Sequence, residues 1–67
     1  MTDTIELQVA IKRAGLTSRD MARRIGVSDT SFYQKCHNKT EFKVSEIRTI
    51  ADTLKLTIED VQRIFFA

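Results

Sequence analysis

The stretch "ARRIGVSDTSFYQK", Ala22–Lys35, decides how this 67-residue chain is organised. It predicts two helices that are separated by a break at Gly26, because glycine adopts the left-handed backbone conformation that ends many helices. Ser28 follows the break and can cap the next helix through its side-chain oxygen. We expect the two helices over about 18–25 and about 28–38.

The spacing of small and apolar residues within this stretch is typical of two helices that cross at a steep angle. Such a crossing needs a short turn and a small residue where the helices approach. Ala22 supplies the small residue, Gly26 the turn and Val27 an apolar side chain to fill the angle. Phe32 then anchors the second helix in the core, which indicates a helix-turn-helix unit.

The rest of the chain predicts three further helices and no strand. Apolar residues recur at helical spacing over about 4–14, 44–54 and from about 58 to the C-terminal end. Thr17 and Thr57 are each followed three residues later by an aspartate, which is a variant of the capping box. Without a repeat or a linker, residues 1–67 are expected to form one domain.

Charge is unevenly distributed, although the net charge is only +2. Residues 12–24 carry five basic side chains against one acidic one, and residues 35–43 carry three against one. A basic middle suits a polyanionic partner, whereas a solvated surface of mixed charge is the simpler alternative.

Catalysis and metal binding find little support in the sequence. The single cysteine, Cys36, lies beside the single histidine, His37. Neighbouring helical residues point about 100° apart, and no other Cys or His could complete a zinc site. We therefore expect no enzyme activity, no metal and no cofactor, with Cys36 as a small core residue.

The lone cysteine also suits a reducing cytoplasm. No apolar stretch is long enough to span a bilayer. The first residues, "MTDTIELQ", lack the basic region and apolar core of a signal peptide. A soluble cytoplasmic protein is expected.

The chain resembles the helix-turn-helix family of phage Cro and repressor proteins through Met21-Ala22, Ile25-Gly26-Val27-Ser28 and Phe32. The resemblance extends over nearly the whole chain, which looks like the short Cro- or repressor-like proteins of prophages in Gram-positive bacteria. It implies an all-α, five-helix domain of the lambda-repressor type, with sequence-specific binding to double-stranded operator DNA. One departure stands out: Lys35 occupies a usually apolar position and Cys36 follows it, which indicates a rotated second helix of the unit.

In this family the N-terminal half of that helix enters the major groove. With Phe32 and Cys36 inward, helical geometry directs Thr30, Tyr33 and Gln34 outward as base-reading candidates. Gln34 could pair with adenine through its amide, and Thr30 could contact a thymine methyl group. Tyr33 has two readings, a contact with DNA or a ring folded over the edge of the core.

Asp29 is also a base-reading candidate, and three roles fit it. It could stabilise the start of its helix by facing the positive end of the helix dipole. It could accept a hydrogen bond from cytosine N4, or it could pair with a nearby arginine.

The phosphate-contact candidates surround these residues. Thr17 and Ser18 begin a helix, where free amides favour an anion. The remaining candidates are Arg19, Arg23, Lys35, His37, Asn38, Lys39 and Lys43.

Small helix-turn-helix domains often bind palindromic DNA as pairs. Ile64, Phe65 and Phe66 are candidates for a homodimer interface, with packing of Phe65 in the core as the alternative. A rival function remains for the same fold, that of a protein-binding adaptor or antitoxin-like subunit. The weak positive charge of the presumed reading helix favours this rival, whereas Gln34, Thr30 and the flanking bases favour DNA.

Overall fold

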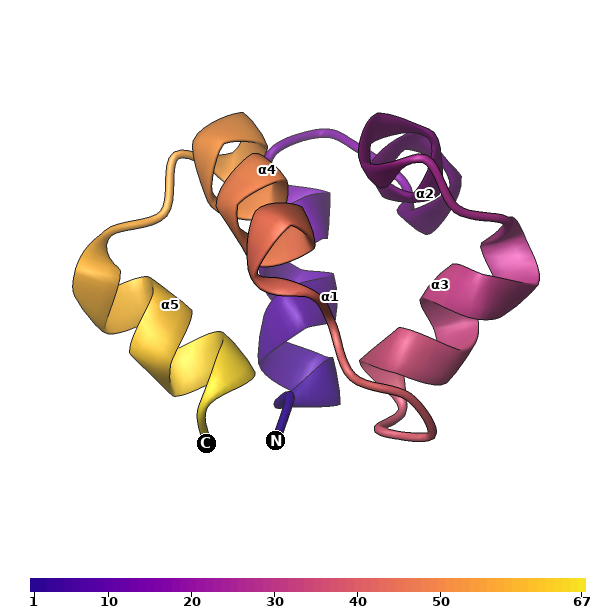
Figure 1. Cartoon of the computed structure of the whole chain (residues 1–67). Helices are drawn as coiled ribbons and strands as arrows, with labels where there is room; N and C mark the ends of the chain where they lie inside the picture. Colours follow the sequence, from indigo (N-terminus) through magenta and orange to yellow (C-terminus); the bar gives the residue numbers. More distant parts are fainter.

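The computed structural model describes residues 1–67 and contains five α-helices and no strand. The helices are α1 (Thr4–Arg13), α2 (Ser18–Ile25), α3 (Asp29–Cys36), α4 (Val44–Leu54) and α5 (Ile58–Phe65). In Figure 1, α4 lies in front of α1 at the centre, with α2 and α3 on one side and α5 on the other. The expected all-α, five-helix architecture is confirmed.

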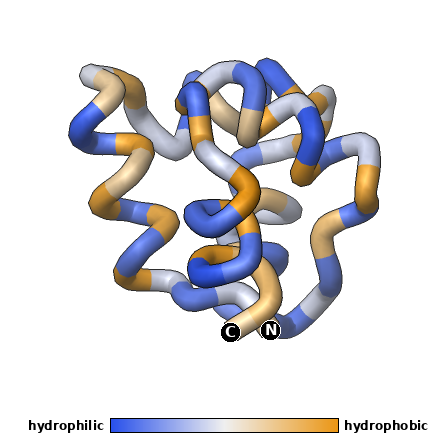
Figure 2. The backbone as a smooth tube through the Cα atoms, turned by 90° about the vertical axis from the view of Figure 1, so that its left-hand side faces the viewer, coloured by the Kyte–Doolittle hydropathy of each residue, from blue (hydrophilic) through white to orange (hydrophobic).

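Every helix contributes apolar side chains to one core. In Figure 2, hydrophobic and hydrophilic residues are interspersed along every helix, as expected of helices that bury one side. Phe42, in the connection between α3 and α4, packs edge to face on Phe32 at 5.8 Å and on Phe65 at 5.4 Å between ring centroids. The nine buried apolar residues are Leu7, Ile11, Met21, Ala22, Phe32, Cys36, Ile50, Ile64 and Phe65.

Side-chain caps begin three of the helices at the residues that the sequence predicts. Thr17 and Asp20 form a reciprocal capping box at the start of α2, and Thr57 and Asp60 form another at α5. The hydroxyl of Ser28 accepts a hydrogen bond from the amide of Ser31 at 3.1 Å. These caps satisfy amides that have no acceptor within their own helix.

Left-handed residues follow four of the helices. Gly15 and Gly26 have φ of 74° and 77°, as expected of helix-ending glycines. Asn38 and Lys55 adopt the same conformation, with φ of 63° and 55°. Helix α3 is therefore shorter than the expected 28–38, because Ser28 caps it from outside and the chain has already turned at Asn38.

The first three residues connect the ends of α3 and α5. The amide group of Asn38 accepts from the Thr2 N–H at 2.8 Å and donates to the Thr2 carbonyl at 2.9 Å. The Asp3 N–H donates to the Ile64 carbonyl at 2.6 Å, and the Ala67 N–H to the Met1 carbonyl at 3.0 Å. The two chain ends consequently lie side by side in both backbone views (Figures 1 and 2).

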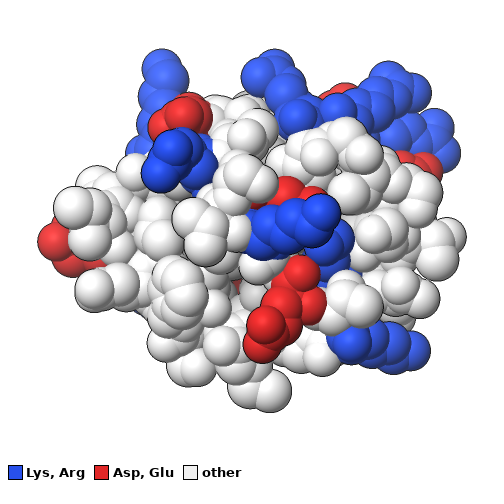
Figure 3. Space-filling model, viewed as in Figure 1, with Lys and Arg blue, Asp and Glu red and all other residues white.

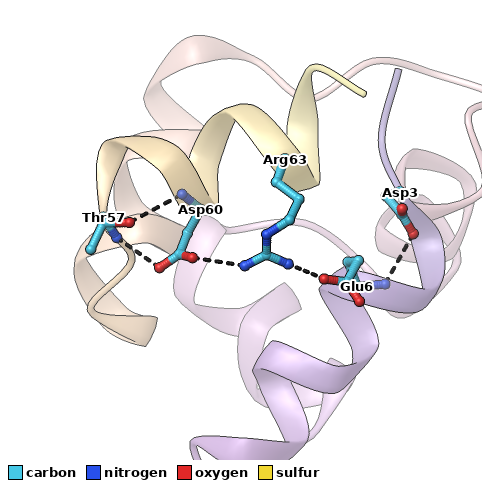
Figure 4. A network of polar contacts seen from close by, with 5 residues as sticks. All are labelled: Asp3, Glu6, Thr57, Asp60 and Arg63. Atoms are coloured by element: carbon cyan, nitrogen blue, oxygen red, sulfur yellow. Dashed lines mark hydrogen bonds and ion pairs between the residues drawn. The ribbon is translucent and has the colours of Figure 1, made fainter.

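A polar network fastens α5 to α1 (Figure 4). The guanidinium of Arg63 pairs with Glu6 of α1 and, at 2.7 Å, with Asp60 of its own helix. Asp3 accepts from the Glu6 N–H at 3.1 Å, so the same network includes the cap of α1. Because Arg63 is half exposed, these pairs contribute modestly to stability and mainly fix how the two helices align.

Candidate nucleic-acid interface

The turn between α2 and α3 sets the angle at which α3 leaves the body of the molecule. The N–H of Gly26 donates to the Arg23 carbonyl at 3.2 Å, and the N–H of Val27 donates to the Ala22 carbonyl at 3.0 Å. This pair of bonds, with Gly26 left-handed, is a Schellman motif. A Cβ at Gly26 would meet nothing within 4 Å, so glycine is favoured here by its backbone conformation and not by lack of space.

Helix α3 divides cleanly into an inward and an outward side. Phe32 and Cys36 are each 1% exposed, whereas Asp29, Thr30 and Tyr33 are exposed. The side chain of Gln34 is partly exposed. The outward side therefore presents a carboxylate, a hydroxyl, an aromatic ring and an amide, which are groups able to contact base edges.

Tyr33 does not fold over the core. It is 57% exposed, and its ring lies against the ring of His37 with 4.2 Å between centroids. The structure thus favours the open orientation of Tyr33 over the core-edge alternative. His37 is also exposed, at the C-terminal end of α3.

Asp29 pairs with an arginine across the two helices. Arg19 Nε of α2 lies 3.3 Å from Asp29 Oδ2 of α3, and both side chains are mostly exposed, at 68% and 60%. Asp29 is also the first residue of α3, where the helix dipole favours negative charge. In this one position, Asp29 can both stabilise the start of α3 through the helix dipole and pair with Arg19, which are two of the three roles considered for it.

These side chains border a groove of about 280 Å³ between α1, α2 and α3. Phe32 and Cys36 contribute to its lining, and polar groups from the three helices contribute the rest. Gln8 of α1 belongs to this border, and its Oε1 accepts a hydrogen bond from Ser18 Oγ at 3.4 Å. The sequence did not single out Gln8, because nothing in the local pattern of α1 shows that α2 begins beside it.

The start of α2 offers backbone groups more readily than side chains. The hydroxyl of Thr17 is engaged with Asp20, which it contacts at 3.0 Å as donor and 3.2 Å as acceptor. The backbone N–H of Thr17, and then its hydroxyl, lower the pKa of Asp20, so this carboxylate is ionised at neutral pH. The amides of Ser18 and Arg19 remain in the first turn, which lacks intrahelical acceptors.

The exposed cationic side chains nearest to α3 in the chain come from α2 and from the α3–α4 connection, not from the outward side of α3. Arg19, Arg23, Lys39 and Lys43 are all exposed. In Figure 3, basic side chains gather over α2 at the upper right, whereas the surface over α3 below them is mostly uncharged.

Lys35 requires correction and Asn38 is partly engaged, although both were expected to reach phosphates. Lys35 is only 8% exposed, and its Nζ lies 3.1 Å from Glu46 Oε1 of α4. Positions 32, 35 and 36 share one side of a helix, which brings Lys35 inward together with Phe32 and Cys36. The amide of Asn38 is occupied by the backbone of Thr2. Lys35 is therefore not free to reach a phosphate, whereas the exposed Asn38 keeps a second amide N–H.

Glu46 is held in its ionised form by this arrangement. Desolvation alone raises the pKa of its carboxyl group. Hydrogen bonds from the backbone N–H of Lys43 and from Lys35, together with both lysine charges, outweigh that effect and lower the pKa overall. The N–H of Lys43 donates to Glu46 Oε1 at 2.8 Å.

The candidate dimer residues separate into core and surface. Ile64 and Phe65 are 1% and 4% exposed, so both belong to the core and neither is available to a partner. The expectation for these two is corrected. Phe66 is 63% exposed, and Ile58 of the same region is 75% exposed.

Groups for metal binding and nucleophilic chemistry are sparse. No cluster of three or more His, Cys, Asp or Glu side chains is placed to hold a metal ion. Burial raises the pKa of the Cys36 thiol to about 11, so it is a neutral core side chain at physiological pH. None of the helices has the length and apolar character needed to cross a membrane.

Comparison with known proteins gives one finding. The family model described as a Cro/C1-type HTH DNA-binding domain matches residues 6–64. Those residues include all of α2, α3 and α4 with their connections. Neither the comparison with curated proteins nor that with solved structures gives a match.

Proposed function

Because the chain belongs to the family of Cro/C1-type HTH DNA-binding domains, we propose that it is a sequence-specific transcription regulator whose α3 reads operator DNA in the major groove. The observation that carries this proposal is the outward side of α3. It presents Thr30, Tyr33 and Gln34, and the segments before and after α3 carry exposed cations. The cations of these neighbouring segments suit contacts with phosphates, and the neutral polar side chains of α3 suit contacts with bases.

Gln34 and Thr30 are the proposed base readers. The amide of Gln34 can bond both N6 and N7 of adenine, and Thr30 can contact a thymine methyl group or a hydrogen-bonding edge. Tyr33, held open beside His37, can contact a methyl group with its ring or a phosphate with its hydroxyl. Asp29 can accept from cytosine N4 through Oδ1, because its pairing with Arg19 engages only Oδ2.

Phosphate contacts are proposed at both edges of α3. On one edge, the free amides of Ser18 and Arg19 lie beside the guanidinium groups of Arg19 and Arg23. On the other edge lie His37, Lys39 and Lys43, which are exposed after α3. The hydroxyl of Thr17 is already engaged with Asp20. Thr17 therefore supports the phosphate contact at this edge only by beginning α2 there.

A homodimer on palindromic DNA is part of the proposal. Two copies would place their α3 helices about 34 Å apart, one turn of the duplex. Phe66 and Ile58 are exposed apolar side chains at one edge of the molecule and are the proposed contacts. A groove between α4 and α5 is bordered by both of them.

The proposed biological role is that of a phage or prophage repressor or Cro-like protein, acting in the bacterial cytoplasm. This role rests on the family match. Regulation by such a domain follows from occupying a promoter and needs no chemistry of its own.

Selection from a library of random duplexes tests the function directly. We expect one enriched sequence, bound at least a thousandfold more tightly than a shuffled duplex at moderate salt. Gln34→Ala should cost about 1–3 kcal/mol of discrimination at one base pair, with little effect on the shuffled duplex. Fluorescence anisotropy with unlabelled competitor DNA measures the affinity of the wild type and of Gln34→Ala for the enriched and the shuffled duplex.

Lys43→Gln should weaken both duplexes alike and reduce the salt slope of log K by about one. Lys55→Gln is the matched control, because it removes the same charge from the α4–α5 connection on the opposite side of the molecule (Figure 1). Failure to enrich any sequence would contradict the proposal. It would favour a protein-binding role, for which the absence of Lys and Arg on the outward side of α3 is the supporting observation.

A further inference from the structure

A buried ion pair joins α3 to the start of α4. Lys35 Nζ lies 3.1 Å from Glu46 Oε1, and the two side chains are only 10% and 8% exposed. Lys35 Nζ also donates to the backbone carbonyl of Glu41 at 3.1 Å, and it lies 6.0 Å from the centre of the Phe42 ring. The charged end of Lys35 is therefore fixed from two segments at once, α4 and the connection that precedes it.

Glu46 is fixed as firmly as its partner. Its Oε1 also accepts from the Lys43 N–H at 2.8 Å, which is the capping bond at the start of α4. No buried polar side-chain atom in the molecule lacks a hydrogen-bond partner, and Lys35 Nζ and Glu46 Oε1 each have two. Its geometry is thus set by the backbone of α4 and cannot relax independently of that helix.

Stability alone does not explain this pair. Removing two charges from water is costly, and well-packed apolar residues in place of a buried ion pair often give equal or greater stability. A buried pair differs from an apolar contact in its directionality, because hydrogen bonds hold one orientation whereas methyl groups tolerate several. Here the orientation in question is the rotation of α3 about its own axis.

That rotation decides which side chains face outward. Lys35 directly follows Gln34, and each residue of a helix turns by about 100°. A shift of Lys35 toward or away from α4 would therefore carry Thr30, Tyr33 and Gln34 with it. A rotation that leaves the core intact would still move the ends of these side chains relative to base edges.

We propose that Lys35 and Glu46 are positioning residues, which set the rotation of α3 and thereby the sequence preference of DNA binding. This inference rests on the proposed function. It predicts that loss of the pair affects discrimination between sequences more than affinity for DNA in general, since the exposed cations before and after α3 are untouched.

The test replaces the pair by apolar residues of similar size in Lys35→Met/Glu46→Leu. We expect a melting temperature close to that of the wild type, because the gain from removing two buried charges is offset by the loss of the bond from the Lys43 N–H that caps α4. Affinity for the selected duplex should fall at least tenfold, while affinity for the shuffled duplex stays within about twofold. Ile50→Val, a core substitution away from the pair, is the control: it should lower the melting temperature and leave the ratio of the two affinities unchanged.

A double variant that folds and keeps the wild-type affinity ratio would overturn the inference while leaving the proposed function intact. If the double variant does not fold, Lys35→Met supplies the comparison, because it removes the bonds from Lys35 to Glu46 and Glu41 and leaves the bond from the Lys43 N–H to Glu46 in place. A wild-type protein without any sequence preference would instead contradict the proposed function itself, and the inference with it.

Discussion

At the scale of single residues, Asp29 illustrates how position determines the effect of a charge. It begins α3, where the helix dipole favours a carboxylate, and it pairs with Arg19 across the corner of the helix-turn-helix. Both side chains are largely exposed, so neither interaction is strong. A carboxylate at this position is therefore compatible with a nearby DNA backbone, because it is already compensated by an arginine.

We expect Asp29→Ala to lower the free energy of unfolding by about 1 kcal/mol or less, as judged by urea denaturation. Asp52→Ala is the matched control. Asp52 is exposed in the last turn of α4, where the dipole disfavours negative charge, so its removal should be neutral or slightly stabilising. An unchanged stability in Asp29→Ala, with relaxed preference at one base pair, would assign Asp29 to base reading instead.

At the scale of helices, the sequence predicts where several helices begin better than it predicts how they end. The caps at Thr17, Ser28 and Thr57 could be predicted because each depends on a local pattern of a few residues. The left-handed residue after α4 could not, because it is Lys55, and lysine has no preference for that conformation. There the packing of Leu56 and Leu54 against the core overrides the local preference.

Lys55→Gly should therefore stabilise the protein by about 0.5–1 kcal/mol, since a residue with a Cβ is strained at φ of 55° and glycine is not. Thermal or urea unfolding measures the change. Lys12→Gly provides the opposite case, because Lys12 lies within α1, where glycine should cost roughly 1 kcal/mol. Equal effects of the two substitutions would show that Lys55 is not strained.

In the candidate site, too, the local sequence predicts the placement of some side chains and not of others. The outward placement of Thr30 and Tyr33 follows from the helical period once Phe32 is placed in the core. The burial of Lys35 could not be predicted in the same way, because charged residues are rarely buried and its partner Glu46 belongs to another helix. Such pairs depend on how two helices pack against each other, and this packing cannot be predicted from the sequence of either helix alone.

At the scale of the whole molecule, two carboxylates link stability to pH. The pKa of Asp20 is lowered by the backbone N–H and then the hydroxyl of Thr17. The pKa of Glu46 is also lowered, because its hydrogen bonds and the lysine charges outweigh desolvation. Groups with a lowered pKa in the folded state stabilise it above their ordinary pKa, and this contribution disappears as the pH falls through the folded value.

The protein should accordingly lose stability as the pH falls below about 4.5, the ordinary pKa of a glutamate. Glu46→Gln should be less stable at neutral pH and should show a shallower loss on acidification. Thermal unfolding from neutral to acidic pH tests this. Glu59→Gln is the control: Glu59 is exposed, so its loss should leave the acid dependence close to that of the wild type.

The central claim concerns which side of the molecule meets DNA, and a nuclear magnetic resonance titration with the selected duplex tests it most directly. We predict that backbone amide shifts change at the start of α2, along the N-terminal half of α3 and in the α3–α4 connection, and that they saturate at a stoichiometric ratio. Changes concentrated on α5 around Ile58 and Phe66, with α3 unaffected, would contradict the account.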